Sequence, residues 1–253
     1  MREAFQDSLL KAGLSAATDA VISGCSAGGL ATYLHTDQWC DAVQASSPGA
    51  KCVGLPDSGF FLDFEDPRAT PVVGGEATIV KKTKGVAPLD GDAQLGATSP
   101  GNYHQGLRWS FEAQNAGVNA DCVASKAAGE AYRCMFAEHA AEHLRSPVFA
   151  LQSKYDSWQT GHVLFDGDNA TSVNVLGKNI TARLDAMLLG TNPASGAFLD
   201  ACHHHCGSWN SVRIDGDLVA DAFAAWYATH ADPSAKKLWD QSEAYPCDAC
   251  CAP

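Results

Sequence analysis

The sequence of 253 residues lacks several features that would assign it to special classes of protein. No apolar run approaches the ~18 residues that a membrane-spanning helix needs, so we expect no membrane partner. Lys and Arg number 17 against 29 Asp and Glu, with no basic cluster, and this argues against a nucleic-acid partner because phosphate binding needs clustered cations. Repeats, low-complexity tracts and a Pro/Gly/Ser-rich linker are also lacking. A hydrophobic content of 46% therefore predicts one globular domain over residues 1–253, which we expect to be a monomer.

The start of the chain lacks the charged-then-apolar pattern of a signal peptide, but its cysteines predict secretion. Ten Cys in close groups indicate a disulfide framework and an oxidising compartment. Two N-glycosylation sequons, which begin at Asn169 and Asn179, fit the same location. We therefore expect a secreted glycoprotein, with no signal peptide in the chain as it stands.

Close spacing predicts two disulfides, Cys40–Cys52 and Cys122–Cys134. Cys202 or Cys206 is expected to pair with the group at 247–251, and spacing alone does not choose between them.

Hydrophobic patterning alternates short strands with helices along the chain. Strands are predicted at 19–23, 51–55, 147–152 and 197–200, and helices at 2–12, 27–42, 125–143, 182–189 and 218–228. Residues 63–120, rich in Gly, Pro and small polar side chains, are predicted to form loops and short elements. This alternation predicts an α/β sandwich around a largely parallel sheet.

A Gly-x-Ser-x-Gly motif lies between the first predicted strand and the helix that follows it, with Ser26 at its centre. In that setting the motif is typical of a nucleophile elbow, a sharp turn that raises the serine hydroxyl above the edge of the sheet. The backbone N–H of Ala27 could then donate to an oxyanion. The alternative is a βα turn in which small residues serve packing alone.

A serine nucleophile needs a base, and an acid that orients the base. Asp156 follows the strand at 147–152, although Asp is also a common helix N-cap. The run 203–205 is three consecutive histidines after the strand at 197–200, and the residues alone do not select one of them. Tyr155 and Trp158 flank the acid and could shape a substrate pocket, with core packing as the alternative.

The cluster Cys202-His203-His204-His205-Cys206 also has an alternative interpretation as a zinc site. Its Cys-x3-Cys spacing lacks the paired CxxC knuckles that make structural zinc sites specific. We therefore expect disulfides around a histidine, and neither a metal nor a cofactor.

Four segments together resemble the pectin acetylesterase/Notum family. They are Gly24-Cys25-Ser26-Ala27-Gly28-Gly29-Leu30, Asp57-Ser58-Gly59-Phe60-Phe61-Leu62-Asp63, Tyr155-Asp156-Ser157-Trp158-Gln159 and the Cys-x-x-His-Cys pattern at 202–206. The Cys-Ser-Ala-Gly-Gly and Tyr-Asp-Ser-Trp-Gln versions are those of plant-type pectin acetylesterases. The resemblance implies an α/β-hydrolase fold, secretion to the cell wall, and hydrolysis of O-acetyl esters on acetylated pectin or a related polysaccharide without a cofactor. It also implies Ser26, Asp156 and His205 as the catalytic residues.

The resemblance raises one conflict with the start of the chain. The family takes a second oxyanion donor from a Gly-rich segment with a Trp before the nucleophile, and the 25 residues before Ser26 hold no such segment. The early strands of the fold are missing as well. We therefore expect a serine esterase whose N-terminal part is absent. The alternatives are a non-catalytic or unstable remnant that binds carbohydrate, or a protein deacylase like Notum.

Overall fold

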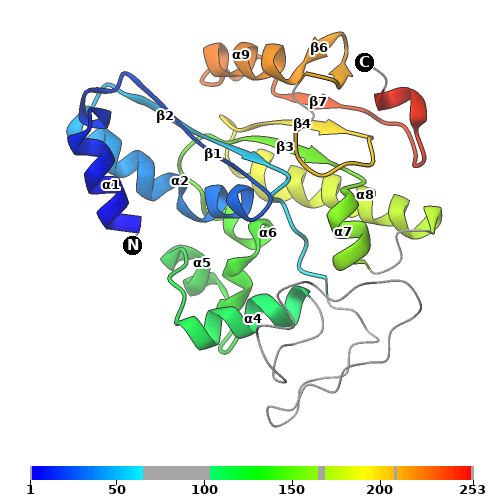
Figure 1. Cartoon of the computed structure of the whole chain (residues 1–253), viewed down its shortest axis with the longest axis horizontal. Helices are drawn as coiled ribbons and strands as arrows, with labels where there is room; N and C mark the ends of the chain where they lie inside the picture. Colours follow the sequence, from blue (N-terminus) through cyan, green and yellow to red (C-terminus); the bar gives the residue numbers. More distant parts are fainter. Residues whose placement is uncertain (1, 65–102, 165–168, 208–209, 252–253) are drawn as a thin grey trace.

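The computed structural model describes residues 2–64, 103–164, 169–207 and 210–251. Its centre is a parallel sheet of five strands in the order β1-β2-β3-β4-β7 (Figure 1). The strands are β1 (Asp19–Cys25), β2 (Lys51–Asp57), β3 (Phe149–Ser153), β4 (Gly196–Asp200) and β7 (Leu238–Asp240). The predicted α/β class with a parallel sheet is therefore confirmed.

Helices connect the strands and cover the sheet. They are α1 (Arg2–Lys11), α2 (Ala27–Ser46), α4 (Tyr103–Gln114), α5 (Ala120–Ser125), α6 (Ala137–Ala140), α7 (Ser157–His162), α8 (Ala170–Leu184) and α9 (Val219–Thr229). Shorter turns are the 3-10 helices η1 (Leu14–Ala16), η2 (Ala131–Met135), η3 (Ala141–His143) and η5 (Asp248–Cys251), the π-helix η4 (Asp185–Leu189), and the hairpin β5 (Arg213–Ile214) and β6 (Asp217–Leu218). None of the helices described is long and apolar enough to cross a membrane.

The sheet has a hydrophobic core on each face, because successive strand residues point to opposite sides. Phe149 and Leu151 of β3 pack with Trp226 of α9 on one face. Ala150 of β3 packs on the other face, with Leu176 of α8 and with α2. Figure 1 shows α9 above the sheet and α2 and α8 below it. The result is a three-layer sandwich whose strands all end on the same side.

The position of each strand agrees with its sequence. All five residues of β3 and of β4 are buried, as expected of short apolar runs in the middle of a parallel sheet. Within the described residues, β1 forms an edge of the sheet, and its burial alternates, so that Val21 is 42% exposed while Ala20 is buried.

The prediction of one helix over 125–143 is wrong. The chain there forms the end of α5 and then the short turns η2, α6 and η3. Gly129 has a left-handed φ of +86°, and Phe136 is extended between η2 and α6, so neither residue can continue a helix. The Cys122–Cys134 disulfide folds the segment back on itself.

Other elements escaped prediction. The helix α4 lies within 63–120, which was expected to hold loops and short elements, while residues 65–102 of that stretch lie outside the described residues. The short helix α7, the hairpin β5–β6 and strand β7 were also missed, and the helix at 182–189 is the end of the longer α8 followed by η4.

All ten cysteines form disulfides. The predicted pairs Cys40–Cys52 and Cys122–Cys134 are confirmed, and Cys202 is the cysteine that reaches the C-terminal group, through Cys251. The pairs Cys25–Cys206 and Cys247–Cys250 were not predicted.

Candidate active site

Ser26 lies on a sharp turn between β1 and α2, with φ 58° and ψ −120°. Small residues make the turn possible. A Cβ on Gly24 would lie 2.6 Å from the Gly28 carbonyl, and one on Gly29 would lie 2.5 Å from the carbonyl oxygen of Asp57. The backbone N–H of Ser26 donates to that same Asp57 oxygen at 2.9 Å. The turn therefore has the close backbone approach that a nucleophile elbow requires.

The structure brings together Ser26, Asp156 and His205, which the sequence separates widely. His205 Nε2 lies 2.8 Å from Ser26 Oγ, and His205 Nδ1 lies 2.8 Å from Asp156 Oδ2. The three residues follow the C-terminal ends of β1, β3 and β4. The Asp156 carboxylate is fully buried, whereas the His205 side chain is 18% exposed. A serine hydroxyl, an imidazole and a buried carboxylate are thus linked in the order that acyl transfer uses.

Asp156 is held by more than the histidine. Its Oδ1 accepts the backbone N–H groups of Trp158 at 3.0 Å and Gln159 at 2.9 Å, at the start of α7. Its Oδ2 accepts from Gln152 Nε2 at 3.3 Å as well as from the imidazole of His205. The carboxylate is therefore a helix N-cap and a partner of His205 at once, so both interpretations of Asp156 describe the same group.

Ala27 is the first residue of α2, a helix of 20 residues. Backbone N–H groups in the first turn of a helix have no intrahelical acceptor and carry the positive end of the helix dipole. The first turn of α2 therefore offers donors next to the Ser26 hydroxyl, as an oxyanion site requires.

The other two histidines of the run have different partners. His204 Nε2 lies 2.9 Å from Asp200 Oδ1, and His203 Nε2 lies 3.2 Å from Thr160 Oγ1. Burial lowers the pKa of His204, but its hydrogen bond to Asp200 and the charge of that residue outweigh burial and raise the pKa. Burial in turn raises the pKa of Asp200 against the influence of His204. His205 alone of the three contacts Ser26 and Asp156.

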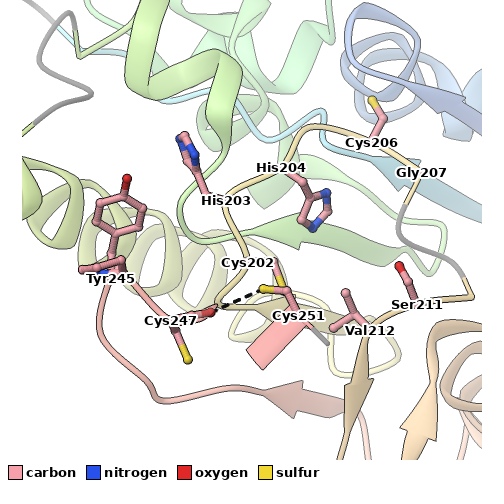
Figure 2. Close-up of a pocket in the computed structure, with 11 residues that line it drawn as sticks. Cys202, His203, His204, Cys206, Gly207, Ser211, Val212, Tyr245, Cys247 and Cys251 are labelled. Carbon is pink, nitrogen blue, oxygen red and sulfur yellow. Dashed lines mark hydrogen bonds between the residues drawn. A yellow bond between two sulfur atoms is a disulfide. The ribbon is translucent and has the colours of Figure 1, made fainter. Parts of the chain in front are cut away.

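The disulfides contradict the zinc alternative. Cys202 is bonded to Cys251 and Cys206 to Cys25, so neither sulfur is a free thiolate. Figure 2 also shows the rings of His203 and His204 pointing to different sides of their loop.

A cavity of about 550 Å³ lies beside this histidine loop (Figure 2). His203, His204, Ser211, Val212 and Tyr245 are among its lining residues. Ser26, Asp156 and His205 are not among those that the structure describes there, so the cavity adjoins the loop rather than the reacting groups.

An aromatic cluster flanks His205. The ring centroids of Trp158 and Phe61 each lie 6.2 Å from that of His205 and 5.0 Å from each other, and Tyr103 lies 5.3 Å from both. Tyr155 lies elsewhere: it is buried, and its hydroxyl donates to the carbonyl oxygen of Glu243 at 2.7 Å. Of the two pocket candidates, Trp158 faces the histidine, whereas Tyr155 packs in the core.

Sequence reasoning missed Phe61 and Tyr103 as neighbours of the site. Phe61 belongs to the Asp57–Asp63 segment, and that unusual motif was the signal that could have indicated it. Tyr103 lies at the start of an unpredicted helix and had no such signal.

Asp63, Glu138 and His139 form a group whose ligand atoms lie within 4.8 Å of one another. Side chains of the protein already occupy the Asp63 carboxylate: Arg133 forms an ion pair with it, and the rings of His104 and His139 are hydrogen-bonded to its oxygens. Burial alone would raise the pKa of Asp63, but the hydrogen bonds from both histidines and the charge of Arg133 hold it well below its ordinary value. This set fits an internal ion cluster better than a metal site.

Comparison with known proteins gives consistent results. The model of the pectinacetylesterase family matches residues 1–252. Pectin acetylesterase 5 of Arabidopsis thaliana is 28% identical, over 98% of this chain and 55% of its own length, and pectin acetylesterase 4 is 27% identical, over 98% and 57%. The human palmitoleoyl-protein carboxylesterase NOTUM is 28% identical, over 86% of this chain and 40% of its own.

Among solved structures, the Wnt deacylase Notum from Drosophila superposes with a TM-score of 0.69 at 20% identity. The superposition covers 98% of this chain and 63% of the Notum chain, and it shows that the two share a fold. The chain spans about half the length of the curated relatives that it matches.

Proposed function

Because the chain belongs to the pectinacetylesterase family, we propose that it is a serine carboxylesterase that hydrolyses O-acetyl esters of cell-wall pectin and releases acetate. The observation that carries the proposal is the hydrogen-bonded series from Ser26 through His205 to Asp156. The names of the Arabidopsis relatives support the acetyl ester and the polysaccharide.

The proposed reaction proceeds in two acyl transfers. His205 Nε2 takes the proton of Ser26 as Oγ attacks the acetyl carbonyl, and the N–H of Ala27 donates to the resulting oxyanion. When the tetrahedral species collapses, His205 returns that proton to the sugar oxygen, which leaves as the alcohol. Water, deprotonated by the same imidazole, then attacks the acetyl-serine, and acetate is released as Ser26 regains its proton.

Asp156 supports both steps without changing its own charge. Its Oδ2 accepts a hydrogen bond from the N–H at Nδ1 of His205, which fixes the tautomer with an unprotonated Nε2, and it stabilises the imidazolium that forms in each transfer. Trp158 and Phe61 are proposed to form the wall against which the acyl group lies, because their rings flank the imidazole.

A secreted, cell-wall location belongs to the same proposal. It is supported by the five disulfides, which persist in oxidising compartments, and by the exposure of both sequon asparagines, Asn169 and Asn179. The single-domain assignment over 1–253 and the monomeric state stay predictions.

The decisive experiment measures acetate released from acetylated pectin and from p-nitrophenyl acetate. Ser26→Ala is expected to reduce the rate to background, and Asp156→Asn to lower kcat by ~10⁴-fold because the wrong tautomer of His205 is then favoured. Ser8→Ala, at an exposed serine of α1, is the matched control and should keep the wild-type rate. Equal rates for the wild type and Ser26→Ala would contradict the esterase and favour the non-catalytic alternative.

A further inference from the structure

The residues next to Ser26 and His205 are joined to each other. Cys25 precedes the serine and Cys206 follows the histidine, and the two form a disulfide across 181 residues of sequence, with their Cα atoms 6.0 Å apart. The link therefore connects the backbone of the two groups that must exchange a proton.

The order of the strands in the sheet separates Ser26 from the start of the loop that carries His205. Ser26 follows β1 and His205 follows β4, and β2 and β3 lie between these strands. Neighbouring strands are ~4.8 Å apart, so the two strand ends are separated by ~14 Å. The loop after β4 must cross the ends of two strands to reach the serine, and it has no regular secondary structure of its own at 201–207.

Two hydrogen bonds to residues at the end of β2 also hold the backbone that follows His205. The N–H of Cys206 donates to Ser58 Oγ at 2.9 Å, and the N–H of Gly207 donates to Asp57 Oδ2 at 3.1 Å. Ser58 Oγ in turn donates to Asp57 Oδ1 at 2.9 Å. Asp57 is the last residue of β2 and Ser58 comes directly after it, and the two are buried, at 7% and 1% exposure.

The backbone of Cys206 shows that these contacts determine its position. Its φ is +61°, in the left-handed region that non-glycine residues seldom adopt. Such a conformation persists where several surrounding contacts enforce it, and here these are the disulfide and the two hydrogen bonds.

We infer that the Cys25–Cys206 disulfide and Ser58 are positioning elements for the reaction, which hold the His205 imidazole against the Ser26 hydroxyl. The inference rests on the proposed function. Catalytic groups must stay within ~0.5 Å of the productive geometry, and a displacement of 1 Å can cost ~10²-fold in rate. Neither the disulfide nor Ser58 belongs to the aromatic wall, so their loss should lower kcat rather than raise KM.

The test compares two double variants that each remove one disulfide. Cys25→Ser/Cys206→Ser is expected to lower kcat ~10- to 100-fold with KM within about twofold of the wild type. Cys40→Ser/Cys52→Ser, which unlinks α2 from β2, is the matched control and should keep kcat. Rates are measured well below the melting temperature of each variant, so that lost folding is not read as lost positioning.

A second variant keeps the test open if the first fails to fold. Ser58→Ala leaves the disulfide intact and removes only the acceptor for the N–H of Cys206 and the bond to Asp57. Its kcat is expected to fall ~10-fold, again with little change in KM.

An NMR measurement separates the inference from the proposed function. The downfield proton shared by His205 Nδ1 and Asp156 should be visible in the wild type and in the Cys40/Cys52 variant, but lost in the folded Cys25/Cys206 variant, whether or not the protein turns over substrate. If Ser58→Ala and the Cys25/Cys206 variant both keep the wild-type kcat and this resonance, the positioning role is wrong. Equal kcat losses in the two double variants would also overturn it. A wild type that keeps the resonance but is no faster than Ser26→Ala contradicts the esterase alone.

Discussion

Ser26 occupies a backbone conformation that its neighbours impose. Its φ of 58° lies in the left-handed region, and such residues cost ~1–3 kcal/mol unless the surrounding structure fixes them. Two hydrogen bonds do so: the Ser26 N–H donates to Asp57, and the Leu30 N–H donates to the Ser26 carbonyl, each at 2.9 Å. The elbow thus depends on how closely α2 can approach the end of β2.

The glycines of the elbow allow a direct test of that approach. Gly29→Ala would place a Cβ 2.5 Å from the Asp57 carbonyl oxygen and 2.9 Å from Gly59 Cα, so the two backbones must separate. We expect the free energy of unfolding, measured with urea, to fall by ~1–3 kcal/mol. The Cβ added by Gly28→Ala would meet no heavy atom within 4 Å. This substitution should be neutral or stabilise the fold by up to ~1 kcal/mol, since alanine is the better helix former. Equal effects at the two positions would show that the close approach does not limit stability.

At the scale of elements, α8 shows how a helix is fixed by one face. Leu176 is 3% exposed and packs in the core beneath the sheet, while its neighbour Val175 is 51% exposed. Leu176→Ala is expected to lower the free energy of unfolding by ~2–5 kcal/mol because it leaves a cavity. Val175→Ala, one residue away, should change it by no more than ~0.5 kcal/mol. Thermal or urea unfolding of the pair measures the difference, and similar losses would argue that α8 does not pack as described.

The elements that sequence patterning predicted are those whose burial is continuous or periodic. Strands β3 and β4 are short apolar runs, and α2 follows a glycine-rich turn, so local pattern and environment agree. The six residues of α7 are too few for a helical period, and their start is marked only by the Asp156 cap. Strand β7 has three residues and is defined by its pairing with β4, which no local pattern records.

The sequence could indicate which types of residue form the site, but not which of several similar side chains lie close to one another. Motif order pointed to Ser26 and Asp156, but three adjacent histidines have the same chemistry, so residue type did not select among them and only the family resemblance implied His205. The path of the loop over the strand ends places the imidazole of His205 2.8 Å from the serine, while that of His204 is hydrogen-bonded to Asp200. The partner of Cys25 was hidden for the same reason, because that path is a tertiary property.

At the scale of the whole molecule, Asp63 joins parts of the chain that no strand connects. It lies in the segment after β2, and its carboxylate is hydrogen-bonded to His104 of α4, Arg133 of η2 and His139 of α6. Glu138 of α6 also faces it, accepting the Asp63 backbone N–H at 3.0 Å. The ion cluster thereby links the helices that the structure describes between β2 and β3, next to the aromatic cluster of Phe61, Tyr103 and Trp158.

This cluster predicts a pH dependence of stability with a defined sign. The pKa of Asp63 is lowered in the folded state, so its contribution is complete above the unfolded value of ~3.9 and is lost as the pH falls toward the folded value. We expect Asp63→Asn to lower the free energy of unfolding by ~3–5 kcal/mol at pH 7. The difference between the wild type and the variant, called the gap below, should narrow as the pH falls from 4 to 2. Urea unfolding of both proteins across this range measures the gap.

Asp41→Asn is the control for this experiment. Asp41 pairs with Arg145 at the surface, where both side chains are more than half exposed, so its removal should cost at most ~1 kcal/mol. A gap for Asp63→Asn that stays constant down to pH 2 would contradict the role of its ionised form.

Three of the five disulfides also link four stretches of the chain into one covalent species. Cleavage after every Lys and Arg would give peptides 12–51, 52–68, 184–213 and 238–253, which the pairs Cys40–Cys52, Cys25–Cys206 and Cys202–Cys251 hold together. Ser26 and His205 lie on different peptides, but these peptides stay covalently linked as long as the disulfides are not reduced. An acyl label on Ser26 would therefore be recovered from a digest together with His205, the histidine proposed to activate it.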